Sequence, residues 1–210
     1  MIAVDLHSIL YFLGAAVLLT LMPGPDNLFV LGQSIAKGKY AGIFTSFGLC
    51  TGLVVHITAA SAGISAIVYQ SAVIFSVVKY AGAAYLLYLA YKSFRDRGSP
   101  IAIQTENSLN YKGLYRRGVI MNLLNPKVSL FFLAFLPQFV DVAAGHAGLQ
   151  MITLGSIFLV ESLIIFTLIS IFAGKVGQWL QRSPSISRRM NIVQGALFTW
   201  IGLQIAFSEK

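Results

Sequence analysis

The sequence has few charged residues and almost no cysteine. Only 10% of its 210 residues are charged, against about 25% in ordinary soluble domains, while 57% are hydrophobic. This composition excludes a soluble globular domain and indicates an integral membrane protein. The single cysteine, Cys50, excludes an intrachain disulfide and also a thiol redox enzyme, which would need a second thiol.

Motifs for metal or hydrolytic chemistry are also missing. No His-Glu-x-x-His motif and no cysteine pair occur, so the sequence predicts neither a metal site nor a cofactor. The enzyme alternative is an intramembrane serine protease with Ser65 and His56 as its dyad, but the sequence around them lacks the context of a protease. We therefore expect no enzyme, and hydrolytic activity that is lost on Ser65→Ala would contradict this.

Long stretches of low charge predict six membrane-spanning helices, since a helix that crosses a bilayer takes about 20 apolar residues. No room remains for a soluble domain, so we expect a single transmembrane domain over 1–210. Asp5 stands where a secretory signal carries basic residues, and the first stretch is therefore interpreted as a mature helix. The predicted spans are 9–31, 41–68, 72–91, 114–139, 149–173 and 190–207.

A polar cytoplasmic linker over 95–113 divides the spans into a first half, 1–94, and a second half, 114–210. Because three spans precede the linker, the fourth span crosses the membrane in the direction opposite to the first. We therefore expect an inverted repeat of three plus three helices. Small residues from Gly48 to Gly52 allow close packing, either inside the bundle or at the face of a homodimer.

The net charge of +8 comes from basic residues that gather on one face of the membrane. Of the fifteen Lys and Arg residues, twelve fall in connections on one face, one (Lys210) falls on the opposite face, and two lie within spans. Because Lys and Arg are retained on the cytoplasmic side, this distribution predicts that both termini lie outside. It also explains the charge without nucleic-acid binding, for which the sequence offers no aromatic and basic groove.

Two proline clusters, at 23–27 and 125–127, break the first and fourth spans. Proline removes a backbone hydrogen bond, so a broken helix survives in lipid only where protein or a water-filled cavity satisfies the freed groups. Paired breaks of this kind indicate the substrate site of a transporter. We expect the site to contain Pro23, Gly24, Pro25, Asp26, Asn27, Asn122, Asn125, Pro126 and Lys127.

Charged residues beside the breaks suggest how a substrate binds. Asp26 follows the first break, where the restarted helix presents its N–H groups and positive dipole end, so an anion such as a substrate carboxylate can bind there. The alternative is that Asp26 only caps this helix. Lys127 is too far from either end of its span to snorkel fully, and is either a substrate or gating residue or a structural counter-ion.

Three further ionisable residues lie within spans, where an uncompensated charge costs roughly 2.5 to 3.5 kcal/mol. Glu161, near the midplane, is a proton-carrier candidate beside Asp26, with a permanent salt bridge as the alternative. His56 is either a proton relay or a packed, hydrogen-bonded side chain. Lys79 is a counter-ion candidate that also lies within reach of the interface. The charges of Asp26, Glu161, Lys79 and Lys127 sum to zero, which permits ion pairs between the halves.

Aromatic residues form two groups within the spans. We expect both groups to contact lipid and the membrane interface rather than substrate. The groups are Phe131, Phe132 and Phe135, and Tyr85, Tyr88 and Tyr91.

Taken together, these motifs resemble the LysE/RhtB family of amino-acid exporters. The likeness covers nearly the whole chain and is carried by the runs 22–26, 48–56, 79–86 and 122–127. The resemblance implies a multi-pass protein of the bacterial inner membrane that exports amino acids or close derivatives, driven by proton antiport. The style of the motifs is nearer to the homoserine, threonine and leucine exporters than to the lysine exporter.

The leading hypothesis is secondary active efflux, in which a zwitterionic substrate binds between the broken helices. Its carboxylate would lie near the restarted helix and Lys127, and its ammonium near Asp26 or Glu161. A passive channel for small polar solutes is the alternative, but a channel needs a continuous polar lining and most spans offer one ionisable residue or none. Flux that fails to accumulate substrate against its gradient would favour the channel.

Overall fold

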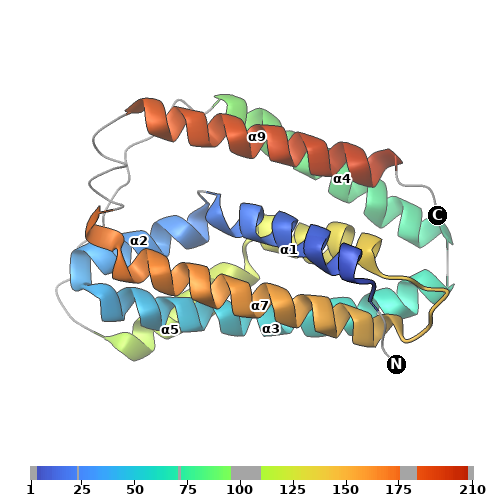
Figure 1. Ribbon diagram of the computed structural model, residues 1–210, viewed down its shortest axis with the longest axis horizontal. Helices are drawn as coiled ribbons and strands as arrows, with labels where there is room; N and C mark the ends of the chain where they lie inside the picture. Colours follow the sequence, from blue (N-terminus) through green and yellow to red (C-terminus); the bar gives the residue numbers. More distant parts are fainter. Residues whose placement is uncertain (1–3, 23, 71, 96–109, 176–183, 208–210) are drawn as a thin grey trace.

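A computed structural model describes residues 4–22, 24–70, 72–95, 110–175 and 184–207. Within these ranges every regular element is a helix, which confirms the all-α prediction, and the long helices run side by side (Figure 1). In chain order they are α1 (Leu6–Leu21), α2 (Pro25–Lys37), α3 (Lys39–Gln70), α4 (Ala72–Arg95), α5 (Tyr111–Leu123), α6 (Pro126–Leu130), η1 (Phe131–Phe135), η2 (Leu136–Phe139), α7 (Ala147–Ile171) and α9 (Pro184–Phe207).

Two single helices and two bent helix pairs are long and apolar enough to cross a membrane. The single helices are α3, over Lys39–Gly63, and α7, over Ala147–Ile171. α1 and α2 form a pair bent by 53°, and α5 forms a second pair, bent by 48°, with the segment Pro126–Phe139. These four candidates match the first, second, fourth and fifth predicted spans. Both bends fall at the predicted proline breaks.

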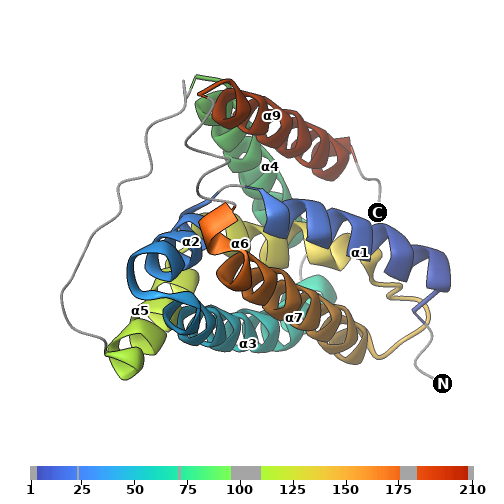
Figure 2. The same ribbon diagram turned by 60° about the vertical axis from the view of Figure 1, so that its left-hand side comes forward.

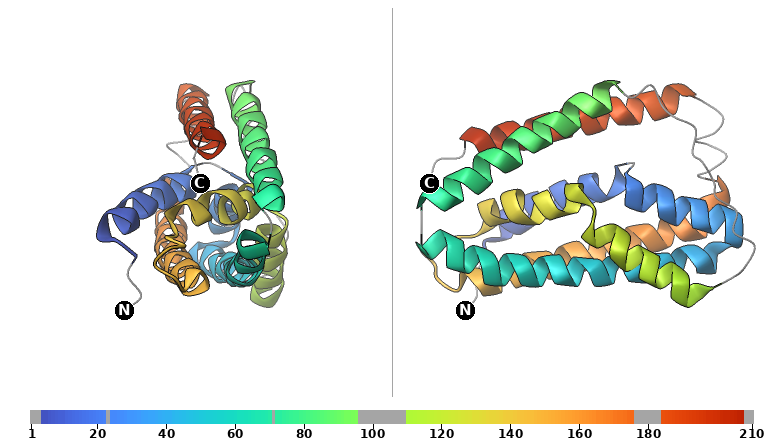
Figure 3. Two further views of the ribbon diagram at one scale, coloured as in Figure 1. Left: turned by 90° about the vertical axis from the view of Figure 1, so that its right-hand side faces the viewer. Right: turned by 180° about the vertical axis from the view of Figure 1, so that it is seen from behind.

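α4 and α9 occupy the positions of the third and sixth predicted spans. They pack against each other as a pair beside the other helices (Figures 2 and 3). Phe198 of α9 is buried, whereas Tyr88 and Tyr91 of α4 are exposed, as expected of residues that face lipid. Neither helix is among the candidate spans found in the described part of the chain. Their crossing of the membrane and the exact inverted repeat stay predictions. Most of the predicted linker, 96–109, lies outside the described residues.

If each bent pair is counted as one span, successive spans alternate in direction, so the connections between them alternate between the two ends of the bundle. In Figure 1, α1 begins and α9 ends at the right-hand end, where α3 also meets α4. Lys37 and Lys39 lie at the left-hand end, where α2 meets α3, and Arg95 and Lys112 lie at the ends of α4 and α5 that point the same way. The start of α1 and the end of α9 thus share one end, and these basic residues lie at the other.

Glycines allow α3 and α5 to approach closely. A Cβ atom on Gly48 would collide with the backbone oxygen of Tyr115, and one on Gly52 would lie 2.7 Å from Oδ1 of Asn122. These contacts place the run from Gly48 to Gly52 against α5, so its close packing occurs inside the bundle. The homodimer stays a prediction.

The three phenylalanines that we expected at the lipid surface are instead buried. Phe131, Phe132 and Phe135 are 2%, 1% and 0% exposed, and they lie in the π-helical turn η1. The ring centroid of Phe131 lies 5.7 Å from that of Phe12 on α1 and 4.8 Å from that of Phe158 on α7. The expectation was wrong because lipid and protein core are equally apolar, so an apolar sequence alone does not distinguish the two.

Candidate functional site

The first break places Asp26 inside the bundle. α1 ends at Leu21 and α2 begins at Pro25, where the missing N–H is tolerated because the first N–H groups of a helix have no partner within it. Asp26, in the first turn of α2, is 5% exposed. Gly24 is the N-cap and no side chain caps α2, so the alternative in which Asp26 caps this helix is not supported. Pro23 lies outside the described residues.

At the second break, the start of the new helix is capped by a residue of the break itself. α5 ends at Leu123 and α6 begins at Pro126. Asn125 is the N-cap of α6, and its Oδ1 accepts a 3.1 Å hydrogen bond from the backbone N–H of Lys127. The side chain of Lys127 is buried as predicted, whereas Pro126 is exposed.

Asn122, at the end of α5, joins the two breaks. Its Nδ2 donates a 3.0 Å hydrogen bond to Oδ2 of Asp26, which links a broken helix of the first half to one of the second. Its backbone oxygen lies 3.2 Å from Nε2 of His56 on α3. Asp26 Oδ1 and Asn122 Oδ1 are both buried and have no hydrogen-bond partner in the described structure. Two acceptor atoms are therefore available to the N–H groups of a ligand.

The ammonium of Lys127 reaches from the second break to the first. Nζ donates to the backbone oxygen of Leu19 at 2.8 Å and to that of Met22 at 3.4 Å. Asn27 Nδ2 donates to the backbone oxygen of Thr20, in the same turn, at 2.6 Å. These carbonyls form the C-terminal end of α1, where the helix dipole is negative. The hydrogen bonds of Lys127 Nζ therefore go to this helix end, and the carboxylate of Asp26 adds a charge interaction without a hydrogen bond to Nζ in the described structure.

Glu161, on α7, lies against the last turn of α1. Its Oε1 accepts hydrogen bonds from Oγ1 of Thr20 at 2.7 Å and from Oγ of Ser162 at 3.1 Å. The side chain is 7% exposed, and Oε2 is buried without a hydrogen-bond partner in the part of the chain that is described. Two hydroxyl groups thus hold this carboxyl group, and no salt bridge with a described side chain does so.

Sequence reasoning missed the hydroxyl groups of Thr20 and Ser162. Ser and Thr are ordinary residues of membrane helices, since they can bond the carbonyl four residues earlier, so their presence alone carried no signal. The useful signals were positional: Thr20 precedes the first break, and Ser162 is adjacent to Glu161.

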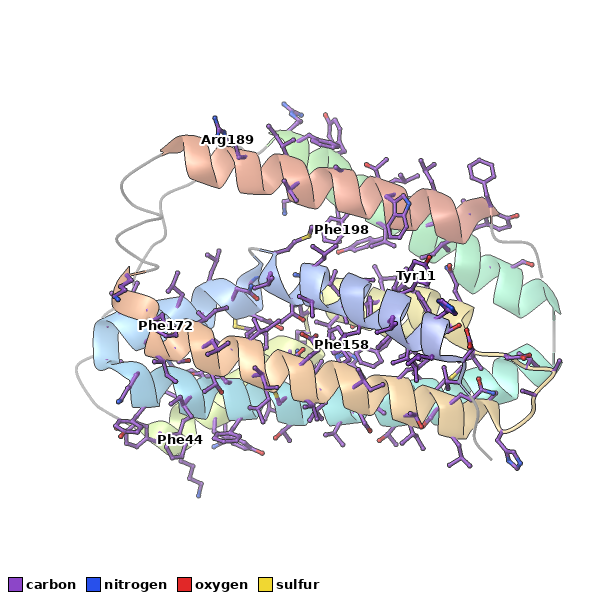
Figure 4. All side chains as sticks on the ribbon, viewed as in Figure 1. Tyr11, Phe44, Phe158, Phe172, Arg189 and Phe198 are labelled. Atoms are coloured by element: carbon purple, nitrogen blue, oxygen red, sulfur yellow. The ribbon has the colours of Figure 1, made fainter. Side chains whose placement is uncertain are left out.

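Residues of the two breaks and of α7 line a small cavity. Six of the predicted residues line it, together with Thr20 and Ser162, and an apolar wall is formed by Leu53, Phe158 and Phe166. Phe158 lies in the interior of the bundle (Figure 4). The cavity volume is about 20 Å³, roughly the room that one water molecule needs. An amino acid can therefore enter only if the walls move apart. The six predicted residues are Gly24, Asp26, Asn27, Asn122, Asn125 and Lys127.

Some predicted residues are not part of the cavity wall. Glu161 borders it through Thr20 and Ser162, and His56 contacts the backbone of Asn122. Pro25 and Pro126 are exposed at the starts of their helices. Lys79 lies on α4, but its side chain is outside the described part of the structure. No group of three or more His, Cys, Asp and Glu side chains that could hold a metal ion occurs among the described residues.

Comparison with known proteins gives a family and several relatives. A family model described as LysE type translocator matches residues 17–209. An uncharacterized membrane protein of Vibrio cholerae is 34% identical over 205 residues, which cover 98% of this chain and 99% of the relative. The leucine efflux protein of Salmonella typhimurium is 29% identical over 199 residues, which cover 93% of this chain and 92% of the relative.

A third relative is the uncharacterized membrane protein YrhP of Bacillus subtilis. It is 28% identical over 212 residues, which cover 97% of this chain and 100% of the relative. No solved structure matches the chain.

Proposed function

The chain belongs to the LysE type translocator family, and we propose that it exports amino acids from the bacterial cytoplasm in exchange for protons. As a member of this family it is a multi-pass membrane transporter and not an enzyme. The observation that carries the proposal is the pair of broken helices, whose buried charged groups meet at one cavity deep inside the bundle. Leucine is the first candidate cargo, because a relative that matches over most of the chain is named a leucine efflux protein.

The chemistry of the cavity suits both ends of a zwitterion. Oδ1 of Asp26 and Oε2 of Glu161 are buried acceptors that an α-ammonium group can satisfy. The α-carboxylate would lie toward the first N–H groups of α2 and toward Lys127, whose ammonium has three N–H groups and uses two on carbonyls. An aliphatic side chain would rest against Phe158 and Phe166.

The small volume of the cavity favours a transporter whose site has to widen to admit the cargo. A volume of about 20 Å³ is too small for an amino acid, so the cavity has to widen before the cargo can bind. Export then requires the two broken helices to separate toward one face and afterwards toward the other, around a fixed site. A permanently open channel does not have this property.

We assign proton coupling to Glu161, with Asp26 and His56 as partners. Glu161 is a buried carboxyl group held by hydroxyls rather than by a described cation, so it can lose and regain a proton without breaking an ion pair. His56 and Asp26 both bond Asn122, one through the backbone and one through the side chain, and so contact a single residue of the second break.

For orientation in the membrane, we propose that the basic end of the bundle faces the cytoplasm of a bacterium and that both termini face outward. The support is the excess of Lys and Arg at one end, together with the shared end of α1 and α9 (Figure 1). The inverted repeat then pairs the bent span α1–α2 with the bent span that starts at α5, since the two run in opposite directions.

The test uses purified protein in liposomes and a panel of amino acids, measured by counterflow with and without a pH gradient. We expect accumulation of apolar amino acids that depends on the gradient, and loss of this dependence in Glu161→Gln. Asp141→Asn, in an exposed connection, is the matched control and should keep it. Flux that never exceeds equilibrium would identify a channel, and unchanged proton dependence in Glu161→Gln would make Glu161 structural.

A further inference from the structure

The C-terminal end of α1 presents its last carbonyl groups inside the bundle, beside the small cavity that Leu19 and Thr20 line. The last carbonyls of any helix lack partners within it. Here the oxygens of Leu19 and Met22 receive hydrogen bonds from Nζ of Lys127, and the oxygen of Thr20 receives one from Asn27. All three carbonyls are therefore satisfied by side chains that come from beyond the break.

Carbonyl oxygens at the negative end of a helix can bind a small cation. Such oxygens can replace the hydration shell of a monovalent ion, and transporters use the ends of broken helices in this way. The ammonium of Lys127 is itself a monovalent cation at this place, and its side chain is only 9% exposed. Oδ1 of Asp26, which lines the same cavity, adds an unpartnered carboxylate oxygen.

We propose that the end of α1 is a monovalent-cation site and that the ammonium of Lys127 fills it permanently, in the place of a sodium or similar ion. Gly24 supports the assignment, because a Cβ atom there would lie 3.3 Å from Nζ and would narrow the room for the ammonium. Lys127 is thus a positioning residue that holds the two breaks together. The binding of a cation at this place can be measured without the cargo, but the consequence, export that needs no sodium or potassium, rests on the proposed function.

The test removes the ammonium in two ways and offers free cations instead. Lys127→Ala deletes the side chain and opens the site, whereas Lys127→Met removes the charge but leaves a side chain of similar length in its place. The thermal unfolding midpoint of each purified protein is measured in choline chloride, sodium chloride, lithium chloride and ammonium chloride at equal concentration. Lys112→Ala, at the exposed start of α5, controls for loss of a surface charge.

We expect the wild type, Lys127→Met and Lys112→Ala to give the same midpoint in all four salts. Lys127→Ala should unfold about 5 °C or more below the wild type in choline and regain at least half of that loss with sodium, lithium or ammonium. Lys127→Ser, with similar room and one more oxygen, should respond at least as strongly.

Three results would overturn the proposal. They are a Lys127→Ala protein that is indifferent to the cation, an equal response in the wild type or in Lys127→Met, and failure of both small variants to fold in every salt while Lys127→Met folds. A liposome assay without amino-acid flux would instead remove the proposed function and leave the cation measurement standing.

Discussion

The two breaks look alike in sequence but are completed in opposite ways. The second break is closed locally, since Asn125 caps α6 through the backbone N–H of Lys127. The first break has no side-chain cap at Gly24. Asn27 satisfies one carbonyl at the end of α1 locally, but Lys127 from the other half of the chain satisfies those of Leu19 and Met22. The second break therefore supplies donors, and the first supplies acceptors. The difference teaches that the first break depends on contact with the second.

Of the changes considered, removal of the negative charge of Asp26 should have the largest effect on export. In Asp26→Asn, the new amide oxygen can still accept from Asn122, so the protein should fold and insert. Under the proposed function, the substitution removes the charge that pairs with the substrate ammonium. We expect export to fall about 100-fold or more, because the ammonium would then be buried without a charged partner. Initial export rates in liposomes, normalised to inserted protein, measure the effect. Near wild-type flux would mean that Asp26 does not contact the cargo.

This contrast marks the limit of what the sequence predicts. Pro25 and Pro126 located both breaks, because proline at the start of a helix has a direct chemical cause. Burial of Asp26, Lys127 and Glu161 followed from their depth within apolar stretches, and all three are buried. The broken helices of the candidate site could therefore be predicted.

The partners of these groups could not be predicted in the same way. The ammonium of Lys127 donates to the backbone oxygens of Leu19 and Met22. Every residue has a backbone carbonyl, so the sequence does not indicate which ones a lysine will contact. The prediction that the phenylalanines of η1 face lipid was wrong for a similar reason. Lipid and protein core are both apolar, so an apolar side chain is compatible with either. Pairings across the fold depend on geometry that composition does not encode.

The contact between the breaks can be strained from a third helix. In Gly52→Ala, the added Cβ atom would lie 2.7 Å from Oδ1 and 2.8 Å from Cβ of Asn122. The side chain of Asn122 would therefore be displaced, and its Nδ2 would move away from Asp26. Overpacking of this kind costs about 1–3 kcal/mol, and we expect the unfolding midpoint to fall by about 2–12 °C and export by about 10-fold.

Gly63→Ala is the matched control for this change. It lies on the same helix, and nothing lies within 4 Å of the added Cβ atom. It should leave both the unfolding midpoint and export close to wild type. If Gly52→Ala and Gly63→Ala lose stability and export equally, the effect comes from the change in α3 itself and not from the contact between the breaks.

Loss of the local cap should have a smaller effect than loss of the contact. Asn125→Ala removes the acceptor for the N–H of Lys127, which costs about 1 kcal/mol and lowers the unfolding midpoint by about 2–4 °C. Export should fall several-fold, because the start of α6 positions Lys127. Asn110→Ala removes the equivalent cap at the exposed start of α5, where Asn110 accepts from Gly113, and should lower stability without changing normalised export.

Substitution of the prolines should have the smallest effect on export. The size of this effect should still differ between the two breaks. Pro126→Ala restores a backbone N–H but leaves the Asn125 cap in place, so the helix should restart at the same residue with export reduced about two-fold. Pro25→Ala acts where Gly24 provides no side-chain cap, so the start of α2 is held less firmly and the loss should be larger. Export rates of the two variants, measured side by side, decide the order. A larger loss in Pro126→Ala would contradict the view that the second break is closed locally and the first is completed by its partner.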